Sequence, residues 1–268
     1  MRIGDIAVGD GAPLVLISGL NVIESLERTM ESALATQDLA ERHGLPVVFK
    51  ASFDKANRSS HRSYRGLGMD EGLRILKRVK RETGMPVTTD VHEPGQAKIV
   101  AEVVDCLQIP AFLCRQTELI KACAATGRAM NIKRGQFIAP HDMKNAVEKA
   151  RYFGAGDVLV TERGTSFGYN DLVVDMRGVV TMREFAPVCF DATHAVQHPG
   201  RNEDASGGDR RFVAPLARAA SAVGIDALFV ETHPDPDRAP CDGQCQLRPD
   251  ELDRLLRDVC AIRAATRA

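Results

Sequence analysis

The sequence has few features that would direct the chain to a membrane, a secretory route or nucleic acid. No run approaches the roughly 20 apolar residues that a membrane helix needs, and residues 1–5 do not begin an apolar signal region. The seven cysteines include no CxxC pair, which argues against a secreted disulfide framework. Lysine and arginine total 35 against 36 acidic residues, so the net charge of −1 gives no general attraction for polyanions. These absences predict a cytoplasmic protein without a membrane or nucleic acid partner.

Motifs for nucleotides and zinc are also missing. The chain has neither a P-loop nor a GxGxxG fingerprint, and Gly66-Leu67-Gly68 is too short to replace them. Cys241 and Cys245 are close together, but no second Cys or His pair has a matching spacing for a zinc site. We therefore expect neither a nucleotide cofactor nor a structural zinc ion.

A repeated strand and helix pattern organises the chain. Continuous apolar runs without polar alternation are typical of parallel strands that are buried on both faces, and amphipathic segments such as 71–81 and 214–223 separate them. The repeat predicts a single (β/α)8 TIM barrel domain over residues 1–268, preceded by a β-hairpin within about residues 1–13. The predicted strands are 14–17, 47–49, 87–89, 106–109, 129–132, 158–161, 188–190 and 227–230.

The most informative stretch is FKASFDKANRSS at residues 49–60. It follows the apolar run 45–49 and carries Lys50, Lys55 and Arg58 together with two serines. Three cations within nine positions repel one another unless an anion lies between them. The stretch therefore predicts an anion site where a strand passes into its loop.

Polar residues follow every predicted strand. In a barrel these strand ends share one face, on which active sites are assembled. The cations would repel by about 1–4 kcal/mol per close pair, so a substrate with several negative charges is the simplest partner. The aspartates could instead serve the barrel end, and His92 and His233 could orient loops. The residues in chain order are Asn21, Lys50, Lys55, Asp90, His92, Gln108, Lys133, Arg163, Asp191, His194, Glu231 and His233.

Six motifs in this order resemble the 3-deoxy-D-manno-octulosonate 8-phosphate synthase family over nearly the whole chain. They are KASFDKANRSS (50–60), TDVHE (89–93), QIPAFLCRQT (108–117), NIKRGQ (131–136), DATH (191–194) and ETHP (231–234). The family condenses phosphoenolpyruvate with arabinose 5-phosphate. The resemblance implies the same reaction here.

The resemblance also implies a role for each matching position. Residues for phosphoenolpyruvate are Lys50, Lys55, Asp90, Gln108, Lys133 and Arg163. Residues for arabinose 5-phosphate are Asn57, Arg58 and Ser59, together with Arg115 and Phe112, which reach the site of a neighbouring subunit and so imply a homotetramer. Catalytic positions are Asn21, Lys55, His194, Glu231 and Asp242, without a decision on which group is the acid or the base.

One position separates two branches of that family. One branch holds a divalent metal with Cys, His, Glu and Asp, and this chain has Asn21 where the cysteine would be. A neutral carboxamide is a much poorer ligand for such metals than a thiolate. The sequence therefore predicts a metal-independent enzyme without cofactors.

Three other functions stay open from the sequence. A sister enzyme uses erythrose 4-phosphate, although it has a Pro-Arg-Thr type segment in place of residues 56–60. A Schiff-base aldolase would use Lys133 as its nucleophile, and a non-catalytic barrel would only bind phosphosugars. Two long polar loops, 198–208 and 234–245, are candidate lids.

Overall fold

A computed structural model describes residues 1–9, 11–200 and 207–266. Within these residues, eight parallel strands close into a barrel in the order β11-β14-β3-β4-β5-β6-β7-β8, which confirms the predicted fold. The barrel strands are β3 (Val15–Val22), β4 (Val47–Ser52), β5 (Val87–Asp90), β6 (Cys106–Ile109), β7 (Ala129–Lys133), β8 (Val158–Glu162), β11 (Val188–Asp191) and β14 (Ala227–Glu231).

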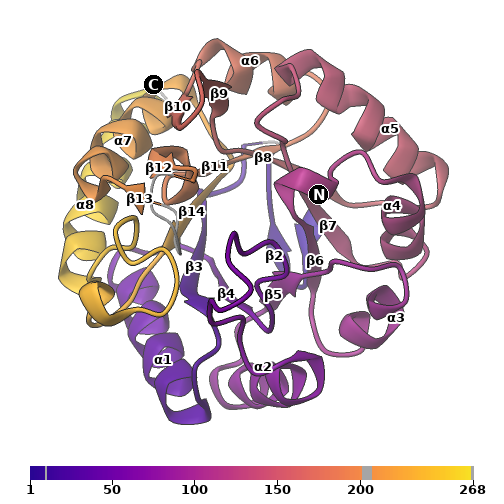
Figure 1. Ribbon diagram of the computed structural model, residues 1–268. Helices are drawn as coiled ribbons and strands as arrows, with labels where there is room; N and C mark the ends of the chain where they lie inside the picture. The colour runs from indigo at the N-terminus through magenta and orange to yellow at the C-terminus, as the bar shows by residue number, and fades with distance from the viewer. Residues whose placement is uncertain (10, 201–206, 267–268) are drawn as a thin grey trace.

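Helices surround the barrel as an outer ring (Figure 1). Ser25 begins the first of them, because its side chain accepts a hydrogen bond from the backbone N–H of Arg28 at 3.1 Å. Gly84 ends the second with a left-handed backbone at φ 71°. The helices are α1 (Leu26–Arg42), α2 (Met69–Thr83), α3 (Gln96–Ala101), α4 (Thr117–Ala124), α5 (Met143–Tyr152), α6 (Arg177–Arg183), α7 (Val213–Val223) and α8 (Pro249–Thr266).

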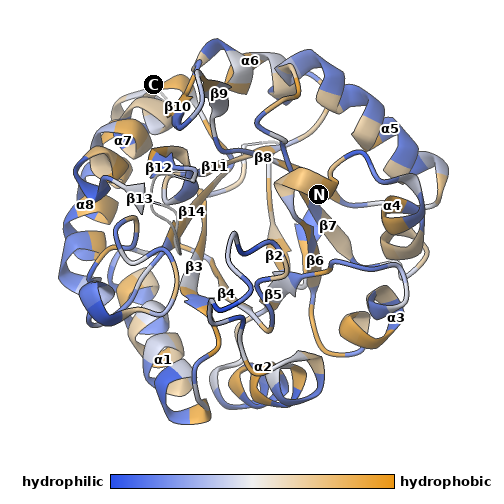
Figure 2. Cartoon of the chain, in the orientation of Figure 1, coloured by the Kyte–Doolittle hydropathy of each residue, from blue (hydrophilic) through white to orange (hydrophobic). Residues whose placement is uncertain are grey.

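The core has two layers. Strand side chains that face outward pack against the helices, whose polar residues in α5 and α8 lie on the outside of the ring (Figure 2). Alternate side chains, such as Val15, Ile17 and Phe229, point inward and form a second cluster. The N-terminal residues Ile3 and Val8 belong to this inner cluster, so they close one end of the barrel.

The predicted N-terminal hairpin is present but shorter than expected. Its strands β1 (Arg2–Ile3) and β2 (Ile6–Ala7) pair antiparallel around Gly4, whose φ of 54° favours glycine. Asp10 lies outside the described residues. None of the described helices is both long and apolar enough to span a membrane.

Several strands extend beyond their predicted ends. Asn21, Lys50 and Lys133 lie within strands β3, β4 and β7, although the sequence predicted them to follow those strands. A polar or charged residue is expected to end an apolar strand. Here the strands continue, because each of these three side chains has a buried polar partner inside the barrel mouth. They are therefore held by the sheet itself, which fixes them more firmly than a loop would.

Candidate active site

A cavity of about 430 Å³ lies at the carboxyl ends of the barrel strands. Most of the predicted site residues line it, and they come from β4, β5, β6, β7, the loops that follow these strands, and the loops after β8, β11 and β14. The predicted residues in its wall are Lys50, Lys55, Asn57, Arg58, Ser59, Asp90, Gln108, Phe112, Lys133, Arg163, His194 and Asp242. The cavity therefore unites both predicted substrate groups.

Each lysine of the cavity faces a carboxylate of the protein. Lys50 is 1% exposed, and its Nζ lies 2.5 Å from Glu231 Oε1. The register explains this pair, because Glu231 and Lys50 both lie beside Gly19, which has no side chain to separate them. Lys133 Nζ lies 2.5 Å from Asp191 Oδ2. The lysines therefore have counter-charges within the protein, in addition to any that a substrate would bring.

The two arginines of the cavity differ from the lysines. Among the described residues, neither Arg58 nor Arg163 has a carboxylate within ion-pair distance. Arg58 Nε and Arg163 Nη1 are buried without a hydrogen-bond partner in that part of the chain. An unpaired buried guanidinium is costly unless a ligand completes it. Both cations therefore remain available to a negatively charged ligand.

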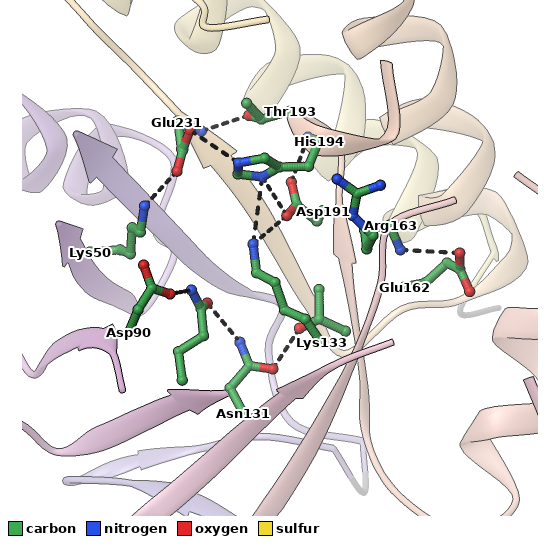
Figure 3. A network of polar contacts seen from close by, with 12 residues as sticks. Lys50, Asp90, Asn131, Lys133, Glu162, Arg163, Asp191, Thr193, His194 and Glu231 are labelled. Atoms are coloured by element: carbon green, nitrogen blue, oxygen red, sulfur yellow. Dashed lines mark hydrogen bonds and ion pairs between the residues drawn. The ribbon is translucent and has the colours of Figure 1, made fainter. Parts of the chain in front are cut away.

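His194 is oriented by Asp191, as Figure 3 shows. Its Nδ1 lies 2.7 Å from Asp191 Oδ2, and its backbone N–H donates to Asp191 Oδ1 at 2.9 Å. The carboxylate of Asp191 accepts at Nδ1, so that nitrogen carries a proton, and Nε2 on the other side of the ring lies 3.6 Å from Glu231 Oε2. Burial opposes ionisation of Asp191, but His194 and Lys133 outweigh it and hold its pKa below the usual range. Asp191 therefore orients both a lysine and a histidine.

Asn21 bridges two carboxylates behind the cavity wall. Its Nδ2 donates to Glu231 Oε2 at 2.6 Å and to Asp242 Oδ2 at 3.1 Å, while its Oδ1 is buried without a partner. The opposite amide orientation would set an oxygen against two carboxylates. An amide N–H cannot ligate a metal, and nowhere in the described residues do His, Cys, Asp and Glu form a group of three suited to one. These residues do not fit a divalent metal.

The chain matches the model of the DAHP synthetase I family over residues 1–266. It belongs to that family. A Synechococcus sp. relative is 56% identical over 266 residues, covering 98% of this chain and 94% of the relative. A Syntrophotalea carbinolica relative is 52% identical, covering 98% and 96%, and a Rickettsia bellii relative is 51% identical, covering 96% and 94%. All three are named 2-dehydro-3-deoxyphosphooctonate aldolase.

Three predicted residues of this DAHP synthetase I family member lie outside the cavity wall. Asn21 and Glu231 are buried behind it, so they position other groups. Arg115 lies in a second cavity of about 360 Å³ between the loop after β6 and α5. Phe112 lines the cavity of its own chain and is 52% exposed.

Several residues of the family member's site are not among the predicted ones. Gln136 and Gln197 line the cavity, and each follows a predicted site residue, Lys133 or His194, by three positions. Asp191 was left undecided, although it contacts both Lys133 and His194. His92 lines the cavity, whereas His233 Nε2 lies 3.0 Å from Glu24 and serves the loop, as expected.

A continuous chain of hydrogen bonds runs from Asp90 and Gln108 in the cavity wall to the neutral side chains Asn131 and Thr161. Asp90 accepts from Ser52 and from Gln108, and Gln108 Oε1 accepts from Asn131 at 3.3 Å. Thr161 then donates to Asn131 Oδ1 at 2.6 Å. These contacts hold the carboxylate of Asp90 4.0 Å from Lys55 Nζ, and so they fix the position of Asp90 in the cavity wall.

Proposed function

We propose that this chain condenses phosphoenolpyruvate with arabinose 5-phosphate and water to give 3-deoxy-D-manno-octulosonate 8-phosphate and phosphate. The observation that carries the proposal is that Arg58 and Arg163 line one cavity, and that each has a buried guanidinium nitrogen without a hydrogen-bond partner among the described residues. Two separate anion sites suit two phosphorylated substrates. The shared name of the relatives, which specifies a 2-dehydro-3-deoxyphosphooctonate, supports this choice of sugar product.

The cavity residues divide between the two substrates. We assign phosphoenolpyruvate to Arg163, Lys133 and Lys55, with Lys50, Asp90 and Gln108 holding that end of the cavity. Arabinose 5-phosphate then lies along Asn57, Arg58 and Ser59, with its phosphate on Arg58 and Ser59. This arrangement sets C3 of phosphoenolpyruvate against the sugar aldehyde.

The reaction needs a proton donor for the aldehyde and a base for water. C3 attacks the aldehyde carbon, the new alkoxide takes a proton, water adds at C2, and phosphate leaves by carbon–oxygen cleavage. His194 and Asp242 line the cavity and are the groups that exchange these protons. The ammonium groups of Lys55 and Lys133 stabilise the carboxylate and phosphate as charge moves.

Mass spectrometry should detect the octulosonate 8-phosphate, whereas release of pyruvate alone would refute the condensation.

Activity should not require a metal ion. Asn21 presents an N–H to Glu231 and Asp242 at the position where a metal ligand would be needed. We expect the enzyme to keep full activity after exhaustive treatment with EDTA. A loss of activity that Mn²⁺ or Zn²⁺ restores would contradict this part of the proposal.

The pH dependence of kcat/KM should follow the protonation of Lys50. Burial lowers the pKa of Lys50 to about 8, even though Glu231 beside it favours the charged form. At Glu231, by contrast, the opposing effect of burial is outweighed by Lys50 and His194, which lower the pKa to about 2, so both groups are charged at neutral pH. We expect kcat/KM to fall as the pH rises through about 8, because the ammonium that holds Glu231 is lost.

The effect of Lys50 on stability cannot explain that fall in kcat/KM. The folded pKa of Lys50 lies below its ordinary value of 10.5, so the unfolded chain binds more protons between these two values. The contribution of Lys50 to the unfolding free energy therefore rises with pH in this window. Thermal melts recorded beside the rate profile separate the two effects, and a flat profile up to about pH 10 would speak against the role of Lys50.

The rival functions are less consistent with the contacts of the site. A Schiff-base mechanism needs a neutral Lys133, but its ammonium is paired with Asp191 at 2.5 Å. A non-catalytic binder has no use for the Asp191–His194 pair beside its anion sites. The sister reaction with erythrose 4-phosphate uses the same phosphoenolpyruvate end, so the sugar is the discriminating substrate.

We further propose a cytoplasmic homotetramer that serves lipopolysaccharide biosynthesis. Phe112 and Phe137 are 52% and 60% exposed on loops near the cavity, and Arg115 lies on the same loop as Phe112. Exposed aromatic side chains of this kind are typical of subunit contacts. Light scattering coupled to size exclusion would measure the oligomeric state.

A further inference from the structure

Gln197 is the hydrogen-bond partner of the Arg163 side chain in the described part of the chain. Arg163 Nη2 donates to Gln197 Oε1 at 2.7 Å. We propose that Gln197 is a positioning residue that directs Arg163 toward the anion of phosphoenolpyruvate without neutralising its charge. The inference rests on the proposed function, because it concerns the affinity for that substrate.

The surroundings of Arg163 show why a neutral partner matters. The neighbouring carboxylate, Glu162, is already occupied by Arg134, which donates to it through Nε at 2.7 Å and Nη2 at 2.5 Å. Glu162 also accepts from the backbone N–H of Arg163 at 3.0 Å (Figure 3). It accepts from the backbone N–H of Gly164 at 2.7 Å as well. The carboxylate of Glu162 thus holds the backbone of Arg163, while the neutral amide of Gln197 is the hydrogen-bond partner of its guanidinium.

A neutral acceptor and a carboxylate have opposite consequences for a ligand. An amide oxygen holds one guanidinium nitrogen in place and leaves the full positive charge for the substrate. A carboxylate at the same place would form a charge-assisted pair that an incoming phosphate or carboxylate has to displace. Nη1 of Arg163 stays buried and unpartnered among the described residues, so it is the nitrogen left for the ligand.

Gln197 is itself held by a small sheet at the base of a loop. It begins β12 (Gln197–His198), which pairs with β13 (Gly207–Gly208), with Gln197 opposite Gly208. Gly208 N–H donates to Gln244 Oε1 at 3.1 Å, which joins this sheet to the loop that carries Asp242. A Cβ on Gly208 would lie 2.1 Å from Cys245 Sγ. The position of Gln197 therefore depends on a close contact outside the cavity.

The first experiment changes the partner of Arg163 directly. Gln197→Met keeps the length of the side chain but removes the acceptor, so the dissociation constant for phosphoenolpyruvate should rise about tenfold. Gln197→Glu keeps an acceptor but adds a charge, so it should weaken binding further, by about a hundredfold. The KM for arabinose 5-phosphate should change by less than about twofold in both variants, because Arg58 is untouched.

A matched control is Gln37→Met. Gln37 lies on α1, where its Nε2 donates to Thr83 O at 3.2 Å, far along the chain from the cavity lining. It has a similar single hydrogen bond, so it reports the general cost of this substitution. We expect its affinity for phosphoenolpyruvate to match that of the unaltered protein.

The second experiment displaces Gln197 by a substitution at a residue outside the cavity. Gly208→Ala should push β13 away from Cys245 and raise the dissociation constant for phosphoenolpyruvate, again without a matching change for the sugar phosphate. Cys245→Ala removes the sulfur that the new Cβ would meet first and leaves a contact of 3.1 Å with Val196 O, so the double variant should recover part of the affinity. Cys245→Ala alone should bind phosphoenolpyruvate normally.

Calorimetric titration with phosphoenolpyruvate separates failure of this inference from failure of the proposed function. If the unaltered protein binds phosphoenolpyruvate and Gln197→Met binds it equally well, the positioning role is wrong while the function stands. The role is also wrong if Gln197→Glu binds as tightly as Gln197→Met, or if both substrates lose affinity together. No binding to the unaltered protein would reject the function and the inference with it.

Discussion

Replacing Arg163 by alanine should lower kcat/KM for phosphoenolpyruvate by about a thousandfold, close to 4 kcal/mol. Arg163 is 5% exposed and has no carboxylate within ion-pair distance in the described residues, so its charge is available to the substrate. Arg163→Lys should recover little, because an ammonium cannot reproduce two parallel hydrogen bonds. Steady-state kinetics with each substrate varied in turn give the comparison.

The control for this variant is Arg177→Ala. Arg177 is exposed and paired with Asp175 at 2.7 Å, so its loss should leave the kinetics unchanged. If Arg163→Ala changed kcat/KM as little as Arg177→Ala does, the assignment of the phosphoenolpyruvate site would have to be abandoned.

Asp191→Asn should damage both catalysis and stability. The substitution leaves the Lys133 ammonium buried without its carboxylate, which costs about 3 kcal/mol of unfolding free energy. It also replaces one of the two acceptor oxygens by an NH2 donor, so Lys133 and the His194 ring and backbone compete for one acceptor, and kcat should fall by about 100- to 1,000-fold. Urea unfolding and single-turnover kinetics on the folded fraction measure the two effects separately.

Asp226→Asn separates these effects further. Asp226 is also a buried aspartate, but it contacts Arg183 and the backbone N–H of Val188, at the start of its strand and outside the cavity. We expect this variant to lose stability while its folded fraction keeps a normal kcat. An unchanged kcat in Asp191→Asn would show that His194 does not need this partner.

The fold could be predicted from the sequence because local patterns carry it. Each barrel strand is a short apolar run, and glycines such as Gly84 and Gly224 mark the ends of the helices that precede strands. The ends of the strands were predicted less accurately. Lys50 ends an apolar pattern but continues the strand, because Glu231 on β14 reaches it across Gly19.

The site was predicted less completely for the same reason. Sequence spacing brought the cations together, but it could not show that Asp191 and Glu231 pair with Lys133 and Lys50 across the barrel. It also gave no signal that Glu162 is taken by Arg134 and so leaves Arg163 to Gln197. Such choices between competing partners depend on distances across the closed barrel, which chain order does not contain.

The central claim is the pairing of phosphoenolpyruvate with a particular sugar phosphate. The most direct test measures phosphate released from phosphoenolpyruvate in parallel reactions with arabinose 5-phosphate and with erythrose 4-phosphate. We expect stoichiometric phosphate release with arabinose 5-phosphate and little with erythrose 4-phosphate. Faster release with erythrose 4-phosphate, or release that needs no sugar at all, would contradict the proposed function.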